Sequence, residues 1–250
     1  MTQHFVVVGG SRGLGRAFAE TALSAGNAVS SVSRQSRPVA RSDRFVQFAC
    51  DLRDSSSTAN VLSLIARERG AFDGIVFCQR YRSAPAQASS EDWGAELAVS
   101  LSATKTLIEQ SVTHFTPEGP KSIVLVSSVN ERLISPHLSP GYHVAKAGLC
   151  QLARYYACRL GPAGIRVNAV CPGTFVKPDS EDYYRLHPEA VTRLVKVSPL
   201  RRLVSHSDVT NAIWFLLQKQ SAAITGQSLT IDGGVSLQWP EHIDAEVSNH

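Results

Sequence analysis

Cysteine is scarce in this chain of 250 residues, and its spacing is irregular. The five cysteines are an odd number, lie far apart and include no C-x-x-C pair. This distribution disfavours a disulfide scaffold or a zinc ribbon and fits a reducing compartment, so we expect a cytoplasmic protein. The eight histidines include no H-x-x-x-H pair, and we therefore expect no metal site.

Long apolar runs are also missing. No stretch approaches the roughly 20 apolar residues of a transmembrane helix, so we expect no membrane partner. Residues 1–4 do not begin a charged and then apolar leader, so we expect no signal peptide. Hydrophobic residues still make up 43% of the chain, which is enough for the core of an ordinary globular protein.

The net charge of +4, from 25 Lys and Arg against 21 Asp and Glu, is concentrated at the start of the chain. Residues 1–45 contain six arginines and two carboxylates, which account for the whole excess. Such a segment suits a polyanion, either a nucleic acid or a dinucleotide. Because the sequence has no DNA-binding motif, we expect no nucleic-acid partner and interpret the excess as part of a dinucleotide site.

Short β-branched runs alternate with helix-length amphipathic segments along the chain. Strands are expected at residues 5–8, 28–32, 45–49, 74–78, 122–126, 165–170 and 228–231. Helices are expected at residues 13–25, 55–69, 91–115, 142–160 and 207–217. This order predicts an α/β fold, a doubly wound, Rossmann-like parallel sheet of about seven strands with helices on both faces. With no repeat and no long linker, we expect a single domain over residues 1–250.

Two stretches depart from this alternation. The sequence of residues 177–199 predicts a short helical insertion that can act as a substrate lid. Its candidate substrate contacts, which can equally be solvated groups, are Tyr183, Tyr184, Arg185, His187, Arg193 and Lys196. Residues 239–250 carry three carboxylates and no Lys or Arg, which fits either a frayed tail or an arm that packs on a neighbouring subunit.

A glycine-rich turn, GGSRGLG at residues 9–15, follows the first expected strand and opens a helix. Glycines let the backbone approach a pyrophosphate closely, and a helix N-terminus offers free N–H groups to it. A plain strand-to-helix turn also uses glycine, so the turn gains its meaning from the β-α-β context. We therefore expect a dinucleotide to bind at Gly9, Ser11, Arg12, Gly13, Leu14 and Gly15.

The end of the second expected strand reads Val32-Ser33-Arg34, with no carboxylate before Asp43. NAD sites usually place an acidic residue here to bind the ribose 2′-hydroxyl. A guanidinium at this position suits the 2′-phosphate of NADP instead. We therefore expect NADP(H) as the cofactor, with Arg34, Arg12 and Ser33 around the adenosine ribose.

Tyr142 and Lys146 form a Y-x-x-x-K pair within an expected helix, so both side chains lie on one helix face. A nearby ammonium favours the phenolate form of a tyrosine, which makes it a better acid–base group. The spacing alone is a common coincidence. Ser127 and Ser128, 14 to 15 residues upstream at the end of a buried strand, raise its significance.

Taken together, these motifs resemble the short-chain dehydrogenase/reductase family, and the match runs nearly from end to end. Further motifs in the family's order are Cys50-Asp51-Leu52, IRVNAVCPG at residues 165–173, ITGQ at 224–227 and IDGG at 231–234. Ser198-Pro199-Leu200 and the late D-G-G are similar to the β-ketoacyl carrier-protein reductase-like branch. The resemblance implies a homo-oligomer, a tetramer or a dimer.

The resemblance also implies residue roles. Tyr142 is expected to protonate the substrate carbonyl oxygen, Lys146 to hold the nicotinamide ribose, and Ser128 to orient the carbonyl. Asp51 is expected to accept a hydrogen bond from the adenine amino group. The implied cofactor site includes Tyr142 and Lys146 and extends to Asp51, Leu52, Cys78, Pro172, Gly173 and Phe175.

The chain departs from the family pattern at four places. Phe77-Cys78-Gln79-Arg80 stands where the family has N-N-A-G, and Arg80 can contact cofactor phosphate, the substrate or solvent. Ser100 takes the place of a catalytic Asn that helps hold a relay water through its main-chain carbonyl. Lys177 replaces a threonine after Pro172-Gly173, and Val8 replaces one before Gly9.

The resulting expectation is an NADPH-dependent oxidoreductase that reduces a ketone of β-ketoacyl or secondary-metabolite type to a secondary alcohol. The ketone is a small molecule or is bound to a carrier. Two alternatives stay open: an alcohol dehydrogenase that runs in the oxidative direction, and an NADP(H)-binding sensor or scaffold with little or no turnover.

Overall fold

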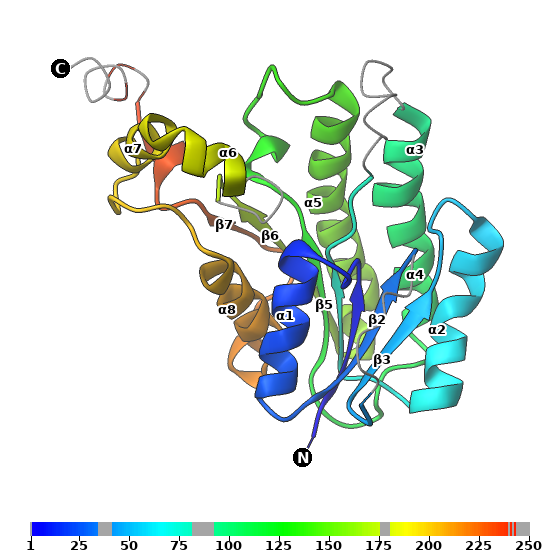
Figure 1. The fold of residues 1–250 in the computed structure, drawn as a ribbon. Coiled ribbons are helices and arrows are strands. Elements are labelled where there is room, and N and C mark those ends of the chain that lie inside the picture. The colour runs from blue at the N-terminus through cyan, green and yellow to red at the C-terminus, as the bar shows by residue number, and fades with distance from the viewer. Residues whose placement is uncertain are drawn as a thin grey trace.

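Seven parallel strands form one sheet in the order β3-β2-β1-β4-β5-β6-β7 (Figure 1). The computed structural model describes residues 2–34, 42–81, 93–175, 181–239, 241 and 243. The strands are β1 His4–Val8, β2 Ala28–Ser33, β3 Phe45–Ala49, β4 Gly74–Phe77, β5 Lys121–Val126, β6 Ile165–Pro172 and β7 Ser228–Ile231. The residues of β1 and β4 are fully buried, as expected for apolar strands at the centre of a parallel sheet.

Helices cover both faces of the sheet (Figure 1). They are α1 Gly13–Ser24, α2 Ser55–Arg69, α3 Trp93–Leu97, α4 Ala103–Ser111, α5 Pro140–Leu160, α6 Glu181–Leu186, α7 Pro188–Lys196 and α8 His206–Leu217. One hydrophobic core lies between the sheet and α2, α4 and α5. A second core lies on the opposite face, where Phe18 of α1 and Ile213 of α8 pack on the strands. The expected doubly wound α/β fold is therefore confirmed.

The strand order reverses at β1, which has β2 on one side and β4 on the other. The crossovers leave in opposite directions at this point, so a crevice opens at the carboxyl ends of these strands. The glycine-rich turn, the residues after β2 and the residues after β4 all meet at this edge. The topology thus brings together segments that are far apart in the sequence.

The expected single helix at residues 91–115 is wrong in its described part. Three segments occupy it: α3, a π-helical turn at Ala98–Ser102, and α4, which ends at Ser111. The Thr104 hydroxyl donates a 2.8 Å hydrogen bond back to the Ser100 carbonyl oxygen. The Ser100 hydroxyl itself donates a 2.7 Å hydrogen bond to the Glu96 side chain. Apolar spacing alone does not distinguish a π-turn from an α-turn.

Helix α5 begins one residue after Ser139, whose hydroxyl accepts a 3.1 Å hydrogen bond from the Tyr142 N–H. Pro140 follows at the first helical position, where its missing N–H costs nothing. These two residues define the start of the helix and place Tyr142 in its first turn. Lys146 lies one turn further along the same face.

The segment expected as a lid contains two short helices, α6 and α7. Residues 176–180, including Lys177, lie outside the described residues, as does most of the 239–250 tail. Among the described residues, no helix is long and apolar enough to cross a membrane.

Candidate functional site

A cleft of about 590 Å³ opens at the crevice between β1 and β4. It is lined by most of the expected site residues: Gly9, Ser11, Arg12, Gly13, Leu14, Ser33, Arg34, Asp51, Leu52, Cys78, Ser128, Tyr142, Lys146, Pro172, Gly173 and Phe175. Two expected residues, Gly15 and Ser100, lie behind this lining. We call the part around Arg12, Ser33, Arg34 and Asp51 the β2 end, and the part around Ser128, Tyr142, Lys146 and Arg80 the α5 end.

The glycine-rich turn can be built only with glycine at its contact points. Gly9 has a φ of +86°, and a Cβ there would lie 2.6 Å from the Gln79 backbone nitrogen. A Cβ on Gly15 would lie 2.4 Å from the Gly9 carbonyl oxygen. The first turn of α1 carries no carboxylate, and the Arg12 side chain does not cap it. The positive end of α1 is thus open to an anion, which fits the pyrophosphate of a dinucleotide.

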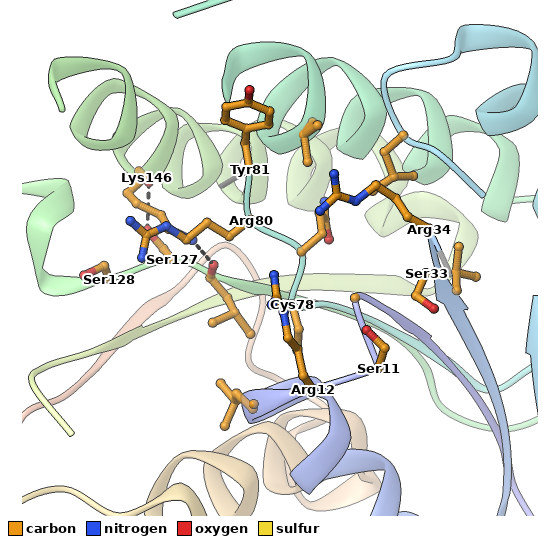
Figure 2. A pocket seen from close by; sticks show the side chains of 18 of the residues that line it. Ser11, Arg12, Ser33, Arg34, Cys78, Arg80, Tyr81, Ser127, Ser128 and Lys146 are labelled. Carbon is orange, nitrogen blue, oxygen red and sulfur yellow. Dashed lines mark hydrogen bonds between the residues drawn. The ribbon is translucent and has the colours of Figure 1, made fainter. Parts of the chain in front are cut away.

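At the β2 end, Arg12 and Arg34 extend from neighbouring strand ends into the same side of the pocket (Figure 2). The Ser33 hydroxyl accepts a 2.7 Å hydrogen bond from Gln47 Nε2. The Asp51 carboxylate is already bound by Arg53, with a shortest N–O distance of 2.6 Å. Hydrogen bonding to the Arg53 side chain lowers the pKa of Asp51, so this carboxylate stays charged.

The positive charge of residues 1–45 is more dispersed than we expected. Arg12 and Arg34 line the cleft, but Arg16 forms a 2.8 Å ion pair with Glu20 on the exposed side of α1. Arg44 precedes β3 and thus lies at the amino ends of the strands, whereas the cleft lies at their carboxyl ends. Arg37 and Arg41 lie outside the described residues. The net charge of the segment therefore overstates the charge at the cleft, because sequence position does not distinguish the two ends of a strand.

At the α5 end, the structure brings Ser128, Tyr142 and Lys146 to one wall. Lys146 Nζ donates a 2.8 Å hydrogen bond to the Val126 carbonyl oxygen and lies 5.5 Å from the centre of the Tyr142 ring. The Ser127 hydroxyl donates to the Lys146 carbonyl oxygen at 2.7 Å and so ties β5 to α5. These bonds orient the lysine toward the phenol.

Ser128 caps the short 3₁₀ turn Val129–Glu131. Its hydroxyl accepts from the Asn130 N–H and donates to Asn130 Oδ1, both at 3.2 Å. The donor bond is long for an O–H group. A carbonyl oxygen in the cleft can therefore compete for this hydroxyl.

Lys146 is only 4% exposed, and burial lowers its pKa to about 8, with the neighbouring Arg80 guanidinium as the next cause. The Glu96 carboxylate acts in the opposite direction and raises the pKa of Lys146. Lys146 therefore changes charge close to neutral pH. This is the range in which an acid–base group is most effective.

The sequence allows Arg80 to contact cofactor phosphate, the substrate or solvent, and the structure shows in which part of the cleft it lies. Its side chain runs from the end of β4 toward Lys146 and Ser127 (Figure 2). The guanidinium carbon lies 4.4 Å from the centre of the Tyr142 ring, in cation–π geometry. Arg80 thus belongs to the α5 end of the cleft.

Glu96 is a residue of the site that the sequence did not indicate. It is 6% exposed, and its Oε1 accepts a 2.7 Å hydrogen bond from the Ser100 hydroxyl. Ser100 therefore presents its side chain to Glu96 rather than to the cleft. The i, i+4 spacing of these two residues is the one signal that could have identified the pair.

The cleft is also lined by residues that were not among the expected contacts: Val32, Cys50, Arg53, Gln79, Tyr81, Val99, Val126 and Ser127. Most of them neighbour an expected residue along a strand end. Phe175 packs edge-on against His206 at 5.0 Å between ring centres, which ties the loop after β6 to the start of α8.

The cysteines show no reactive character in the cleft. Burial raises the pKa of the Cys78 thiol to about 12, so it stays protonated. In the part of the chain that the structure describes, Glu131, Cys150 and Cys171 form one group with potential metal-ligand atoms within 4.8 Å of one another. A structural zinc site takes four ligands, and this group offers three. The two sulfur atoms are 3.6 Å apart and both cysteines are free.

The sequence matches the family described as Enoyl-(Acyl carrier protein) reductase over residues 8–236. D-erythrulose reductase of Gallus gallus is 31% identical over 240 residues, which cover 92% of this chain and 94% of that protein. An uncharacterized oxidoreductase of Schizosaccharomyces pombe is 35% identical over 150 residues, which span 60% of this chain and 57% of the relative.

Solved structures show the same similarity. A protein of Francisella tularensis described as a short chain dehydrogenase family protein shares 26% identity and superposes with a TM-score of 0.79. The alignment covers 95% of this chain and 100% of that one. The family match over residues 8–236 includes every residue that lines the cleft.

Proposed function

Because this chain belongs to the short-chain dehydrogenase/reductase family, we propose that it is an NADPH-dependent reductase that converts a ketone to a secondary alcohol. The observation that carries the proposal is the meeting of Ser128, Tyr142 and Lys146 at one end of a cleft whose other end holds Arg12 and Arg34. The first group suits carbonyl chemistry, and the second suits a phosphorylated ribose.

The cofactor would lie along the cleft. The turn at residues 9–15 would hold its pyrophosphate, while Arg34 and Arg12 would bind the 2′-phosphate through charge-assisted hydrogen bonds. Asp51 and Leu52 would border the adenine, and Pro172, Gly173 and Phe175 would border the nicotinamide. NADPH supplies the hydride when bound.

The residues of the α5 end would carry out the rest of the reaction. The Ser128 hydroxyl would donate a hydrogen bond to the ketone oxygen and fix its position. Tyr142 would protonate that oxygen as negative charge develops on it. Lys146 has a pKa of about 8 and is positively charged when the pH is below that value. Its charge would favour the phenolate that remains on Tyr142 after proton transfer.

Reduction is supported over oxidation by two observations. Arg12 and Arg34 favour a cofactor with a 2′-phosphate, which usually serves reductive reactions in a reducing compartment. The name of the Gallus gallus relative is that of a reductase acting on a keto sugar. An alcohol dehydrogenase in the oxidative direction would use the same residues in reverse.

The test is NADPH oxidation, followed by absorbance, with β-ketoacyl thioesters, keto sugars and diketones. We expect turnover of at least one ketone with NADPH and slower turnover with NADH. Tight NADPH binding without turnover of any ketone would instead favour a sensor or scaffold. Turnover with NADP⁺ and secondary alcohols alone would favour the oxidative alternative.

We propose in addition that the protein is a homo-oligomer, a tetramer or a dimer. Helix α5 exposes Val144 and Tyr155, with 46% and 59% of their surface accessible, and apolar surface of this kind suits a subunit interface. Light scattering of the purified protein measures its mass in solution. A monomer at all concentrations would contradict this part of the proposal.

A further inference from the structure

Arg80 follows β4 and lines the α5 end of the cleft. Its guanidinium lies against the Tyr142 ring at 4.4 Å. Its Nε atom is buried and has no hydrogen-bond partner among the described residues. Within the residues that the structure describes, no carboxylate forms an ion pair with it. Arg80 is half-buried and lines the cleft, so its charge is available to an anion that binds there.

A second half-buried arginine shows what a structural guanidinium looks like in this protein. Arg166 on β6 donates to the Ser221 hydroxyl at 2.9 Å and to the Gln218 carbonyl oxygen at 3.2 Å. Acceptors from the fold thus hold both terminal nitrogens of Arg166. Among the described residues Arg80 has no printed acceptor and contacts an aromatic face instead, so hydrogen bonds within the described fold do not explain its position.

The charges around Arg80 also favour an incoming anion. Lys146 lies close enough for the Arg80 charge to contribute to lowering the pKa of Lys146. Against these two cations the buried carboxylate of the α5 end is Glu96, which is already bound by the Ser100 hydroxyl. The α5 end therefore carries excess positive charge in a poorly solvated place, where a bound anion gains most.

The cofactor's phosphates do not account for this charge. In the proposed function the start of α1 and the glycine-rich turn would hold the pyrophosphate, and Arg12 and Arg34 lie at the β2 end. The substrate is the group that meets Tyr142. We propose that Arg80 binds a carboxylate of the substrate, so that the protein acts on oxo acids whose carboxylate lies near the ketone, as in 2-oxo and 3-oxo acids. This inference rests on the proposed function and specifies its substrate class.

The geometry of the two groups is complementary. A guanidinium presents two parallel N–H groups that match the two oxygens of a carboxylate. With the carboxylate on Arg80, the neighbouring ketone would face the Tyr142 hydroxyl. Loss of such a charge-assisted interaction typically lowers affinity roughly 10- to 100-fold.

The test compares acids with their neutral isosteres. Kinetics use 2-oxobutanoate, 3-oxobutanoate and 3-oxohexanoate, the methyl ester of each, and a β-ketoacyl thioester. We expect wild-type kcat/KM to be at least tenfold higher for one acid than for its ester. In Arg80→Gln this acid-to-ester ratio should fall roughly 10- to 100-fold, while Arg80→Lys should retain part of it.

Calorimetry gives a reading that does not depend on turnover. The NADP⁺-saturated protein is titrated with the same acids and esters, and the acid should bind more weakly to Arg80→Gln than to wild type. The matched control is Arg67→Gln, because Arg67 is an exposed arginine on α2 outside the cleft lining. It should keep the wild-type acid-to-ester ratio.

Three results would overturn the inference. An equal loss for acid and ester in Arg80→Gln would mean that Arg80 acts on Tyr142 and not on the substrate. If Arg80→Gln lost as much affinity for NADPH as for the acid, Arg80 would be assigned to the cofactor. A wild-type protein that reduces esters or thioesters but neither binds nor prefers any acid would refute the substrate class while leaving the proposed reductase intact.

Discussion

At the β2 end of the cleft the charged groups lie near the surface, whereas at the α5 end they are buried or half-buried and close together. The Asp51–Arg53 pair has side chains 36% and 51% exposed. Lys146 and Glu96 are 4% and 6% exposed, and Arg80 lies among them. Water and salt screen the charges of the first group, but they screen those of the second group much less.

This difference assigns different tasks to the two ends. Substitutions at the β2 end should change cofactor affinity and choice, with little effect on the reacting groups. Substitutions at the α5 end should change the pKa values of several ionisable groups at once, because each charge affects the others. The following experiments test that division, starting with the largest expected effect.

Tyr142→Phe removes the proton donor of the α5 end and leaves the ring in place. We expect kcat to fall roughly 10²- to 10⁴-fold, because general acid catalysis contributes about that factor. NADPH affinity, measured by calorimetry, should stay within about threefold. Tyr155→Phe, on the exposed side of the same helix, is the control and should be fully active. Substantial activity in Tyr142→Phe would mean that another group donates the proton.

Arg34→Asp tests the β2 end. We expect NADPH affinity to fall roughly 10- to 100-fold and the preference for NADPH over NADH to disappear, because a carboxylate repels the 2′-phosphate. Arg44→Asp changes the charge by the same amount at the amino ends of the strands and should have little effect. Equal losses in both variants would show that net charge, not a local contact, determines the affinity.

The pH profile of kcat/KM tests the buried lysine. The pKa of Lys146 is about 8, lowered by burial and by Arg80, so the ammonium is present below that pH and lost above it. Activity in the reductive direction should therefore decline up to tenfold per pH unit above about pH 8. In Arg80→Gln the decline should begin at higher pH, because a neighbouring positive charge has been removed. A flat profile from pH 7 to 10 would contradict the role of Lys146.

Ser100→Ala should have the smallest effect on catalysis. It removes the 2.7 Å hydrogen bond to the buried Glu96, so we expect the free energy of unfolding to fall by about 1–3 kcal/mol. The fall in kcat should be less than tenfold, because the Ser100 side chain does not line the cleft. Thermal unfolding and steady-state kinetics measure the two effects, and Ser100→Asn tests the residue typical of the family. An unchanged unfolding temperature in Ser100→Ala would contradict a stabilising role of the Ser100–Glu96 bond.

Most of the fold was predictable because β-branched runs and amphipathic helices have distinct periods. The meeting of Gly9, Ser128, Tyr142 and Lys146 was also predictable, since parallel strands bring their carboxyl ends to one edge. The direction of Arg80 and the burial of Glu96 were not, because a charged side chain in a sequence pattern gives no sign of the tertiary contacts that enclose it. The π-turn was missed for a similar reason: it depends on hydrogen bonds and not on residue type.

The π-turn at Ala98–Ser102 has a consequence for how this segment tolerates changes in length. An α-helix turns by about 100° per residue. A π-turn holds more residues than an α-turn, so it can accommodate one extra residue without changing the register of the two α-helices that flank it. Deleting one residue within it would therefore restore a continuous α-helix and leave α3 in nearly the same register relative to α4. Deleting one residue from the α-helical part of α4 would instead rotate α3 by about 100° relative to the rest of α4. Glu96, whose side chain packs beside Gly141 at the start of α5, would then leave that place. The π-turn is thus the part of this segment that can lose a residue while the buried carboxylate keeps its position.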